Sequence, residues 1–243
     1  LAGEVQHCAR KLHSPRMARA GIIELSIAGR GPSRAFVFDP HRLALPCWAD
    51  VASDGPALLL TLDRHFDTVT PKDAPGRGLS ADALDLHARE RLDHRNFDHI
   101  LAAMNAGVLS DAIVIARAKP VGAVTFDWGA HEVISAATLD LISAEWGTPL
   151  ATPEGKRAYA AVRRATRIVL DVDLDCFTTP SDADPTTVVP WPLELIRDFV
   201  LPRGSDAFWR DVLAKCAGFT FAREPSHCGG LGASGRLFRA TSE

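Results

Sequence analysis

Cysteine is scarce in this sequence, and the cysteines present do not form the pairs that bind zinc or build disulfide frameworks. Among the 243 residues there are five cysteines, an odd number, and none belongs to a CxxC motif. This pattern argues against a disulfide framework and against a structural zinc site. We therefore expect reduced, buried and unreactive thiols in a cytoplasmic protein. The cysteines are Cys8, Cys47, Cys176, Cys216 and Cys228.

Long apolar runs, basic tracts, repeats and low-complexity segments are also missing. No apolar run approaches the roughly 20 residues needed to cross a membrane, and no leader segment is recognisable. The 27 Lys and Arg residues nearly balance the 30 Asp and Glu residues, so the formal net charge is only −3. Such a balance predicts neither a nucleic-acid partner nor a membrane partner. The 47% of hydrophobic residues instead predict a globular protein with a sizeable core.

Strand-like and helix-like segments alternate along the chain. Short apolar runs predict strands at residues 21–27, 34–38, 57–62, 112–116, 123–126, 168–173 and 219–222. Helical patterns are expected at residues 81–107, 134–146, 153–164, 193–200 and 206–216. The alternation predicts one domain over residues 1–243, a three-layer α/β/α sandwich with a mostly parallel sheet of roughly eight strands.

Two further segments are expected to lack regular structure. The irregular stretch at residues 185–192 is interpreted as a surface loop. Residues 230–235 match the pattern G-x-G-x-x-G, but no βαβ unit follows that could hold a dinucleotide. We therefore interpret them as part of a flexible tail.

Two short acidic segments, far apart in the chain, each follow an apolar run of strand type. Carboxylates spaced by two along an extended chain point to the same side, and ligands bind at the carboxyl ends of strands in open α/β sheets. Buried, unpaired carboxylates are too costly to keep without a cation. Oxygen ligands with one or two imidazoles suit Mn²⁺, Mg²⁺ or Fe²⁺. The candidate ligands are Asp63, His65 and Asp67 in the first segment and Asp171, Asp173 and Asp175 in the second.

Other candidate site residues are expected near the same edge. His41 follows one predicted strand and Glu224 follows another. A lone histidine usually has a structural role, however, and Glu224 precedes a turn, where surface residues are common. Asn96 either touches substrate or lies on an exposed helix surface. The pair His227-Cys228 lacks a third partner, so we favour an inert thiol over a nucleophile.

The order of these motifs resembles the ureohydrolase superfamily, the arginase-like enzymes with two Mn²⁺ ions. The resemblance is carried by the DxHxD motif at residues 63–67 and by a second Asp-x-Asp at a strand end. A closer resemblance is to the UPF0489 family, which includes peptide arginases that convert arginine side chains in peptides to ornithine. It is carried by Asp39-Pro40-His41 ahead of the ALPxW sequence at residues 44–48, by Leu170 to Phe177, and by Glu224-Pro225. It covers about residues 35–228.

The resemblance implies a role for each candidate. One ion is bound by His41, Asp63, Asp67 and Asp173, and the other by Asp63, His65, Asp173 and Asp175. Asp63 and Asp173 bridge the two ions, and the water between them attacks the guanidinium carbon. Asp67 accepts a proton and Glu224 orients the substrate. Asp171 is either a hydrogen-bond partner of a ligand or takes the place of Asp175 beside Asp173.

The sequence also departs from arginases. The Gly-Gly-Asp-His segment that precedes DxHxD in arginases is replaced by Asp39-Pro40-His41, and no specificity loop for free arginine is recognisable. His87, His94 and His99 all follow the motif, and the sequence does not single out one of them for proton transfer. These departures favour a peptide over free arginine as the substrate.

The expected function is therefore metal-dependent hydrolysis of a guanidinium group, with a peptide or a small guanidino compound as substrate and urea as a product. Two alternatives remain open at this point. One is a zinc-dependent amide deacetylase, which a mononuclear site would favour. The other is a non-catalytic, metal-dependent binder of arginine-containing peptides.

Overall fold

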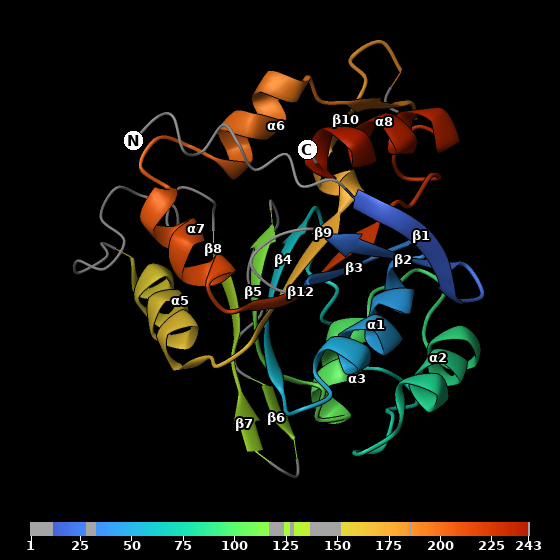
Figure 1. Ribbon diagram of the computed structural model, residues 1–243. Helices are drawn as coiled ribbons and strands as arrows, with labels where there is room; N and C mark the ends of the chain where they lie inside the picture. Colours follow the sequence, from blue (N-terminus) through green and yellow to red (C-terminus); the bar gives the residue numbers. More distant parts are fainter. Residues whose placement is uncertain are drawn as a thin grey trace.

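An open, mostly parallel sheet forms the centre of the molecule (Figure 1). The computed structural model describes residues 12–27, 33–116, 124–126, 129–136, 152–184 and 186–242. Neighbouring strands run parallel from β3 to β8, whereas β2 is antiparallel to both β1 and β3. In the described part of the chain, the sheet has eight strands in the order β1 (Leu12–Arg19), β2 (Ile22–Ile27), β3 (Ser33–Phe38), β12 (Cys216–Ala222), β9 (Ile168–Asp173), β4 (Ala57–Asp63), β5 (Leu109–Ala116), β8 (Val133–Ala136).

Helices cover both faces of this sheet. Three helices pack on one face: α1 (Ala44–Val51), α2 (Ala81–Glu90) and α3 (His99–Asn105). The opposite face is covered by α5 (Pro153–Arg164) and α7 (Asp206–Leu213). The central strands β4 and β9 are buried along their whole length, which is typical of strands covered on both faces. The expected α/β sandwich with a mostly parallel sheet is thus confirmed.

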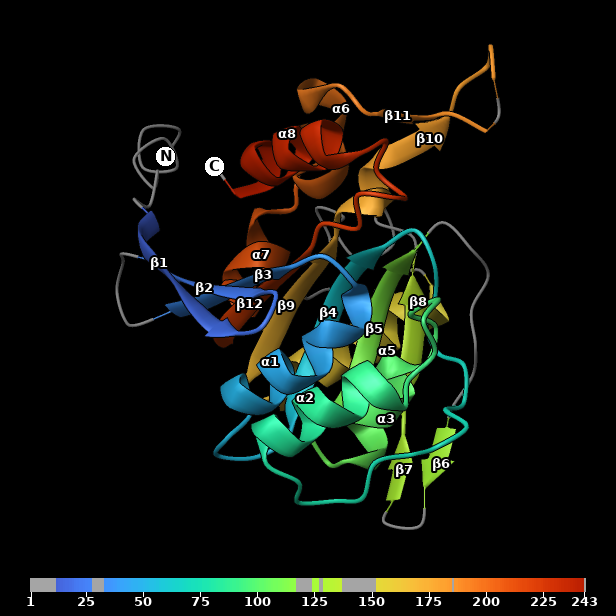
Figure 2. The same cartoon turned by 90° about the vertical axis from the view of Figure 1, so that its right-hand side faces the viewer.

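The remaining elements gather beyond the carboxyl ends of the parallel strands (Figure 2). They are α6 (Leu193–Val200), α8 (Leu231–Ser242) and a two-stranded hairpin of β10 (Thr178–Pro180) and β11 (Val188–Pro190). Two hydrogen bonds join the hairpin and Trp191, the residue after it, to the short 3₁₀ helix η3 (Leu174–Phe177), which follows β9 directly. The carboxyl end of the sheet is therefore where segments distant in sequence meet.

Several local predictions hold, because strand β9 and helices α5 and α6 have the expected bounds. Ser80 caps α2 by accepting a hydrogen bond from the Ala83 N–H, and Thr152 caps α5 in the same way, with Pro153 in the first turn. These elements carry their signals locally, in their caps and in the periodicity of their apolar residues.

Other local predictions were wrong. The helix expected at residues 81–107 is two helices, separated by a turn at residues 91–98. The helix expected at residues 134–146 begins in strand β8, and residues 137–146 lie outside the described part. The expected loop at residues 185–192 contains β11. The strand expected at residues 123–126 is present as β6 (Val124–Phe126), but it pairs with β7 (Gly129–His131) outside the main sheet.

The expected flexible tail is the start of helix α8. The three glycines and one serine of residues 230–235 give this segment a low intrinsic helix propensity. Its buried face carries Ala233 and Leu237, however, and Leu237 belongs to the core beneath α5 and α7. Tertiary packing of one apolar face stabilises this helix where propensity does not.

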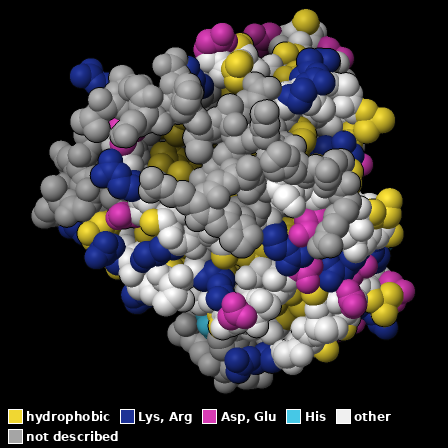
Figure 3. Space-filling view, viewed as in Figure 1, with side chains coloured by type: hydrophobic (Ala, Val, Ile, Leu, Met, Phe, Trp, Pro, Cys, Tyr) yellow, Lys and Arg dark blue, Asp and Glu magenta, His cyan; other side chains and the backbone are white. Residues whose placement is uncertain are grey.

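The surface agrees with the balanced composition. Basic and acidic side chains are interspersed over the described surface of the face in Figure 3, so no large field of one sign is visible there. Of the helices that the structure describes, none is long and apolar enough to span a membrane.

The packing of α1 on the sheet gives a testable prediction. A Cβ at Gly218 in β12 would lie 2.7 Å from the Cγ2 of Val51, a stiff β-branched side chain of α1. Gly218→Ala should therefore lower the free energy of unfolding by about 1–3 kcal/mol in urea melts.

The matched control is Gly235→Ala in α8, where an added Cβ meets nothing within 4 Å. This change should raise stability by up to about 1 kcal/mol, because alanine is the better helix former. Equal stability of the two variants would contradict the close packing of α1 on β12.

Candidate metal centre

Four parallel strands deliver acidic and imidazole side chains to one edge of the sheet. His41 lies in the 3₁₀ helix η2 (His41–Leu43) after β3, and Asp63 ends β4. Asp173 ends β9, and Glu224 follows β12 by two residues. All four are buried, with exposed fractions of 7% or less. The convergence at the carboxyl ends of the strands that was inferred from the sequence is present in the structure.

The first candidate group surrounds the Nδ1 atom of His41. This nitrogen lies 3.2 Å from Asp173 Oδ2, 3.3 Å from Asp67 Oδ2 and 3.7 Å from Asp63 Oδ2. One atom from each of the four side chains falls within 4.8 Å of the others. This spacing is suited to one metal ion held by an imidazole and three carboxylates.

A second candidate group shares Asp63 with the first. His65 Nδ1 lies 3.3 Å from Asp175 Oδ2 and 3.9 Å from Asp63 Oδ1. Asp63 and Asp175 are fully buried, whereas the side chain of His65 is 45% exposed. The two oxygens of Asp63 therefore face different groups, and the second group lies nearer to solvent.

Several atoms of these groups are buried without a hydrogen-bond partner. Within the described residues this holds for His41 Nδ1, Asp63 Oδ2 and both carboxylate oxygens of Asp175. A buried polar atom without a partner costs roughly 1–3 kcal/mol, and more when it is charged. The unpartnered atoms point into the two groups, so the residues fit a bound cation.

The electrostatics of the cluster support the same conclusion. Burial raises the pKa of Asp63 well above its usual range, and the neighbouring Asp67 and Asp173 raise it further. The pKa of Asp173 is also raised, first by burial and then by Asp175. Burial lowers the pKa of His41, but Asp171 and Asp173 outweigh this effect and raise it overall. Without a cation, these groups would hold protons that metal binding must displace.

Asp171 belongs to neither group and instead orients His41. Its Oδ2 lies 2.9 Å from His41 Nε2 and accepts a 2.7 Å hydrogen bond from the Thr61 hydroxyl. Its Oδ1 accepts from the Thr220 hydroxyl, whose oxygen accepts from the Trp48 indole at 3.0 Å. A carboxylate only accepts, so Nε2 of His41 carries a hydrogen, and Nδ1 is the nitrogen whose lone pair a cation in the cluster would use.

The polar row of Thr61, Asp171 and Thr220 depends on strand register. Thr61 on β4 and Thr220 on β12 both lie directly opposite Asp171 on β9. All three are fully buried. This row was not predicted from the sequence, although a threonine inside an otherwise apolar strand is a signal for it.

Glu224 is held by two donors at one oxygen. Its Oε1 accepts a 3.0 Å bond from the His41 backbone N–H and a second bond from the Asn96 side-chain amide. The Oδ1 of Asn96 in turn accepts from the backbone and the guanidinium of Arg42, at 3.3 and 3.1 Å. The other oxygen of Glu224, Oε2, has His227 Nε2 at 3.9 Å. The two oxygens thus differ in availability to a ligand.

Three residues of the site have left-handed backbone conformations. In the described part, the non-glycine residues with positive φ are Asp67 at 44°, Asn96 at 62° and Glu224 at 33°. Such conformations cost of order 1–3 kcal/mol each and persist where the surroundings enforce them. Asn96 lies in the turn between α2 and α3 and is buried beside Glu224. The alternative of an exposed helix surface is therefore wrong.

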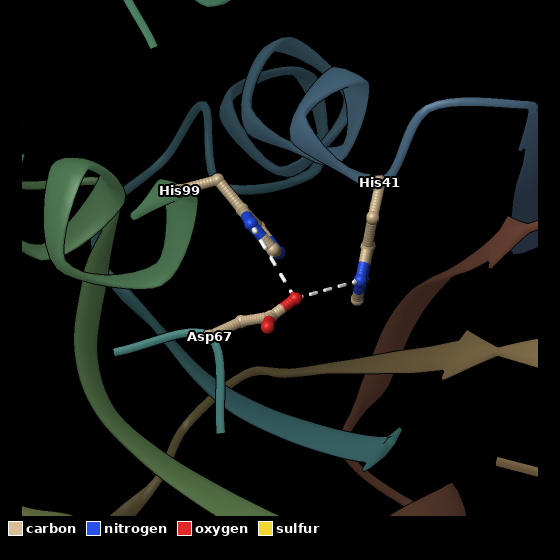
Figure 4. Close-up of side chains that lie close together, drawn as sticks. All are labelled: His41, Asp67 and His99. Atoms are coloured by element: carbon tan, nitrogen blue, oxygen red, sulfur yellow. Dashed lines mark ion pairs between the residues drawn. The ribbon is translucent and has the colours of Figure 1, made fainter. Parts of the chain in front are cut away.

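His99 is the histidine after the DxHxD motif that reaches the site. It is fully buried at the start of α3, and its ring lies 4.2 Å from the ring of His41. Its Nδ1 contacts the Asn96 carbonyl at 2.9 Å and lies 3.9 Å from Asp67 Oδ2. Figure 4 shows the Asp67 carboxylate between the two imidazoles. Burial, and then His41, lower the pKa of His99, so this ring is neutral.

The other histidines and the candidate thiol lie differently. His87 contacts the Asp73 carbonyl, and His94 is exposed. Cys228 is buried, and burial raises the pKa of its thiol, which supports an unreactive cysteine. His227 is exposed beside Glu224 and Asp175, where the three side chains could also approach one cation.

No protein-family model matches this chain, and no curated protein sequence matches it. The geometry of the carboxylates and imidazoles is therefore what carries the interpretation of this site.

The pKa shifts predict how stability depends on pH in metal-free protein. Asp63, Asp173, Asp175 and His41 all have raised pKa values in the folded state. Their contribution to stability is present at low pH and is lost as pH rises through the folded-state values. The melting temperature after chelator treatment should fall from about pH 5 to about pH 8. His99, whose pKa is lowered in the folded state, has the opposite effect on stability. It lowers stability only at pH values at which it becomes protonated in the unfolded chain.

Mn²⁺ should restore the melting temperature at the upper end of this range, because it neutralises the deprotonated carboxylates. Asp63→Asn, which removes the shared carboxylate, should both reduce the pH dependence and abolish the response to Mn²⁺. An equal Mn²⁺ response in this variant would show that the ion binds elsewhere.

Proposed function

We propose that the protein is a metal-dependent hydrolase of guanidinium groups, which converts arginine residues in a peptide to ornithine and releases urea. The observation that carries this proposal is the position of Asp63 in two groups that could each hold a cation, with a further buried carboxylate, Glu224, beside them. Two ions sharing a carboxylate would activate a water for hydrolysis, and a separate carboxylate would pair with a guanidinium.

The residues that would hold two Mn²⁺ ions follow the two groups. His41, Asp63, Asp67 and Asp173 would hold one ion, and Asp63, His65 and Asp175 the other, with Asp173 as the proposed second bridge. Asp63 has the clearer support as a bridge, because each of its oxygens faces a different imidazole. Divalent ions in such a site supply a water of lowered pKa for hydrolysis.

The chain itself would bind the substrate through Glu224. Because Oε1 is held by His41 and Asn96, the less occupied Oε2 is the oxygen that would face the guanidinium. Because φ of Glu224 is positive, the direction of its carboxylate is set by the backbone conformation as well as by the side-chain conformation. Asp67, whose Oδ2 lies 3.3 Å from His41 Nδ1 and 3.9 Å from His99 Nδ1, would take up the proton released during hydrolysis.

One observation favours this function over a deacetylase. A zinc deacetylase needs one metal ion, whereas the two groups described above share Asp63. Catalysis is the property that separates the hydrolase from a non-catalytic binder, so the test must measure a product.

The direct test is urea release from an arginine-containing peptide in the presence of Mn²⁺. We expect urea and an ornithine residue in equal amounts, and loss of both products after chelation. Peptide binding without urea release would overturn the hydrolase and leave the metal-dependent binder.

Asp173→Ala should remove most of the bound metal, measured by elemental analysis, and with it the activity. The matched control is Asp54→Ala, which loses an exposed ion pair with Arg167 at the opposite end of the sheet and should keep both metal and activity. Full metal occupancy in Asp173→Ala would refute the assignment of ligands.

The bond from Asn96 to Glu224 makes a separate prediction. Asn96→Gly keeps the left-handed conformation but removes the donor that holds Glu224 Oε1. We expect KM to rise about tenfold, the loss of one hydrogen bond to a charged group, with a smaller change in kcat.

Asn105→Gly serves as the control, since the Asn105 amide donates to the Pro75 carbonyl away from the site. It should leave KM unchanged. A fall in melting temperature for Asn96→Gly with no change in KM would mean that Asn96 acts on the fold and not on Glu224.

A further inference from the structure

A further set of possible metal ligands lies beside the two groups described above. It consists of Asp175, Glu224 and His227, and one ligand atom from each side chain lies within 4.8 Å of the others. Asp175 is shared with the second group, whereas Glu224 and His227 belong to neither of the two groups. We refer to these three residues as the outer group, because His227 is exposed to solvent.

The outer group is assembled by two neighbouring strands and a turn. Ala222 of β12 pairs with Asp173 of β9 at the carboxyl ends of these parallel strands. Glu224 and Asp175 each lie two residues further along, so they follow adjacent strands in the same register. A turn then brings His227 back to Glu224, because the His227 N–H donates to the Glu224 carbonyl at 2.8 Å. The backbone therefore places the three side chains together.

The spacing within the outer group is suited to a metal ion and is too wide for a direct hydrogen bond. Glu224 Oε2 lies 3.9 Å from His227 Nε2, which is beyond hydrogen-bond distance. Bonds from a divalent ion to nitrogen or oxygen are about 2.0–2.2 Å long, so one ion can contact two atoms roughly 4 Å apart. An imidazole with two carboxylates is a ligand set for a divalent transition-metal ion.

Asp175 gives an independent indication of a ligand. Its side chain is fully buried, and neither of its carboxylate oxygens has a hydrogen-bond partner among the described residues. The second group accounts for one of them, since Oδ2 lies 3.3 Å from His65 Nδ1. The other oxygen, Oδ1, is available to the outer group. An ion bound there would offset the cost of burying this oxygen without a partner.

The charges of the cluster leave Glu224 available to a further cation. Two divalent ions in the first two groups would carry four positive charges, which the four carboxylates of those groups would balance. Glu224 then adds a negative charge at the outer end of the cluster. The proposed function assigns this charge to the guanidinium of the substrate. A metal ion bound by Glu224 and His227 would occupy the same oxygen, Oε2.

We propose that the outer group is a third site for a divalent cation, and that the ion bound there excludes the guanidinium of the substrate from Glu224. The cation site goes beyond the proposed function, whereas the exclusion of substrate rests on it. The side chain of His227 is 56% exposed, so this ion would exchange with solvent and bind more weakly than the other two. A high metal concentration would therefore inhibit the enzyme that a low concentration activates.

The first test counts the Mn²⁺ ions bound to the full chain, by equilibrium dialysis and elemental analysis. Wild type should bind two equivalents tightly and a third more weakly. His227→Ala removes an exposed imidazole that belongs to the outer group alone. It should weaken binding of the third equivalent about tenfold or more and leave the first two in place.

His94→Ala is the matched control, because His94 is exposed and belongs to none of the candidate groups. It should bind all three equivalents as wild type does. Equal binding of the third equivalent by wild type and His227→Ala, or only two equivalents in wild type, would overturn the third site. Loss of the first two equivalents in His227→Ala would contradict a separate outer site.

The second test measures urea release from an arginine-containing peptide as Mn²⁺ is increased. In wild type and His94→Ala, KM should rise about tenfold at ten times the third dissociation constant, with kcat little changed, because metal and guanidinium compete. In His227→Ala this rise should be absent over the same range. A third equivalent that binds without raising KM would overturn the exclusion of substrate.

Dialysis in the presence of the peptide separates this inference from the proposed function. By reciprocity, the peptide should weaken binding of the third equivalent in wild type. If no protein releases urea at any Mn²⁺ concentration, the hydrolase proposal fails. Dialysis with and without the peptide then still decides both parts of the inference, and a third equivalent that the peptide does not weaken would leave the cation site and overturn the exclusion.

Discussion

The structure depends on a concentration of negative charge that is buried at one edge of a parallel sheet. Burial and mutual repulsion both disfavour ionised carboxylates, and these are the two effects that raise the pKa of Asp63 and Asp173. Asp171 differs from these two carboxylates in that Thr61, Thr220 and His41 contact both of its oxygens. Among the described residues, Asp63 Oδ2 and both oxygens of Asp175 are buried without a hydrogen-bond partner. A bound cation would supply the counter-charge that makes their arrangement tenable.

The positions of the ligands come from two different devices. On β4 and β9, the alternation of side chains places Thr61 with Asp63, and Asp171 with Asp173, on the face covered by α1 to α3. Beyond the strand ends this periodicity stops, and the backbone itself turns. Asp67 and Glu224 face the cluster from left-handed conformations. The first device uses regular structure, and the second uses local strain that the surrounding contacts maintain.

Much of this arrangement could be predicted from the sequence, because its signals are local. Apolar runs mark β4 and β9, and the acidic residues that follow them mark the edge where ligands gather. The polar row of Thr61, Asp171 and Thr220 could not be predicted, because it depends on the register of strands that are distant in sequence. The choice of His99 over His87 and His94 depends on the turn that holds Asn96.

The helix α8 and the hairpin of β10 and β11 were missed for a related reason. Glycine-rich sequence has low helix propensity, and α8 is stabilised by the contact of Leu237 with the core. The strands of the hairpin are short and pair only with each other in the described part. The structure of both elements depends on the segments that they contact in the folded chain, and these contacts cannot be inferred from a single sequence.

The polar row also links metal capture to the quality of folding. Thr61 and Thr220 meet Asp171 only when β4, β9 and β12 are aligned as observed, and a slip of one residue would turn each side chain to the opposite face. His41 would then lose the contact that directs its Nδ1 to the cluster. A chain with misaligned strands would thus bind a cation poorly, so cation binding would stabilise the correctly assembled sheet over misaligned forms.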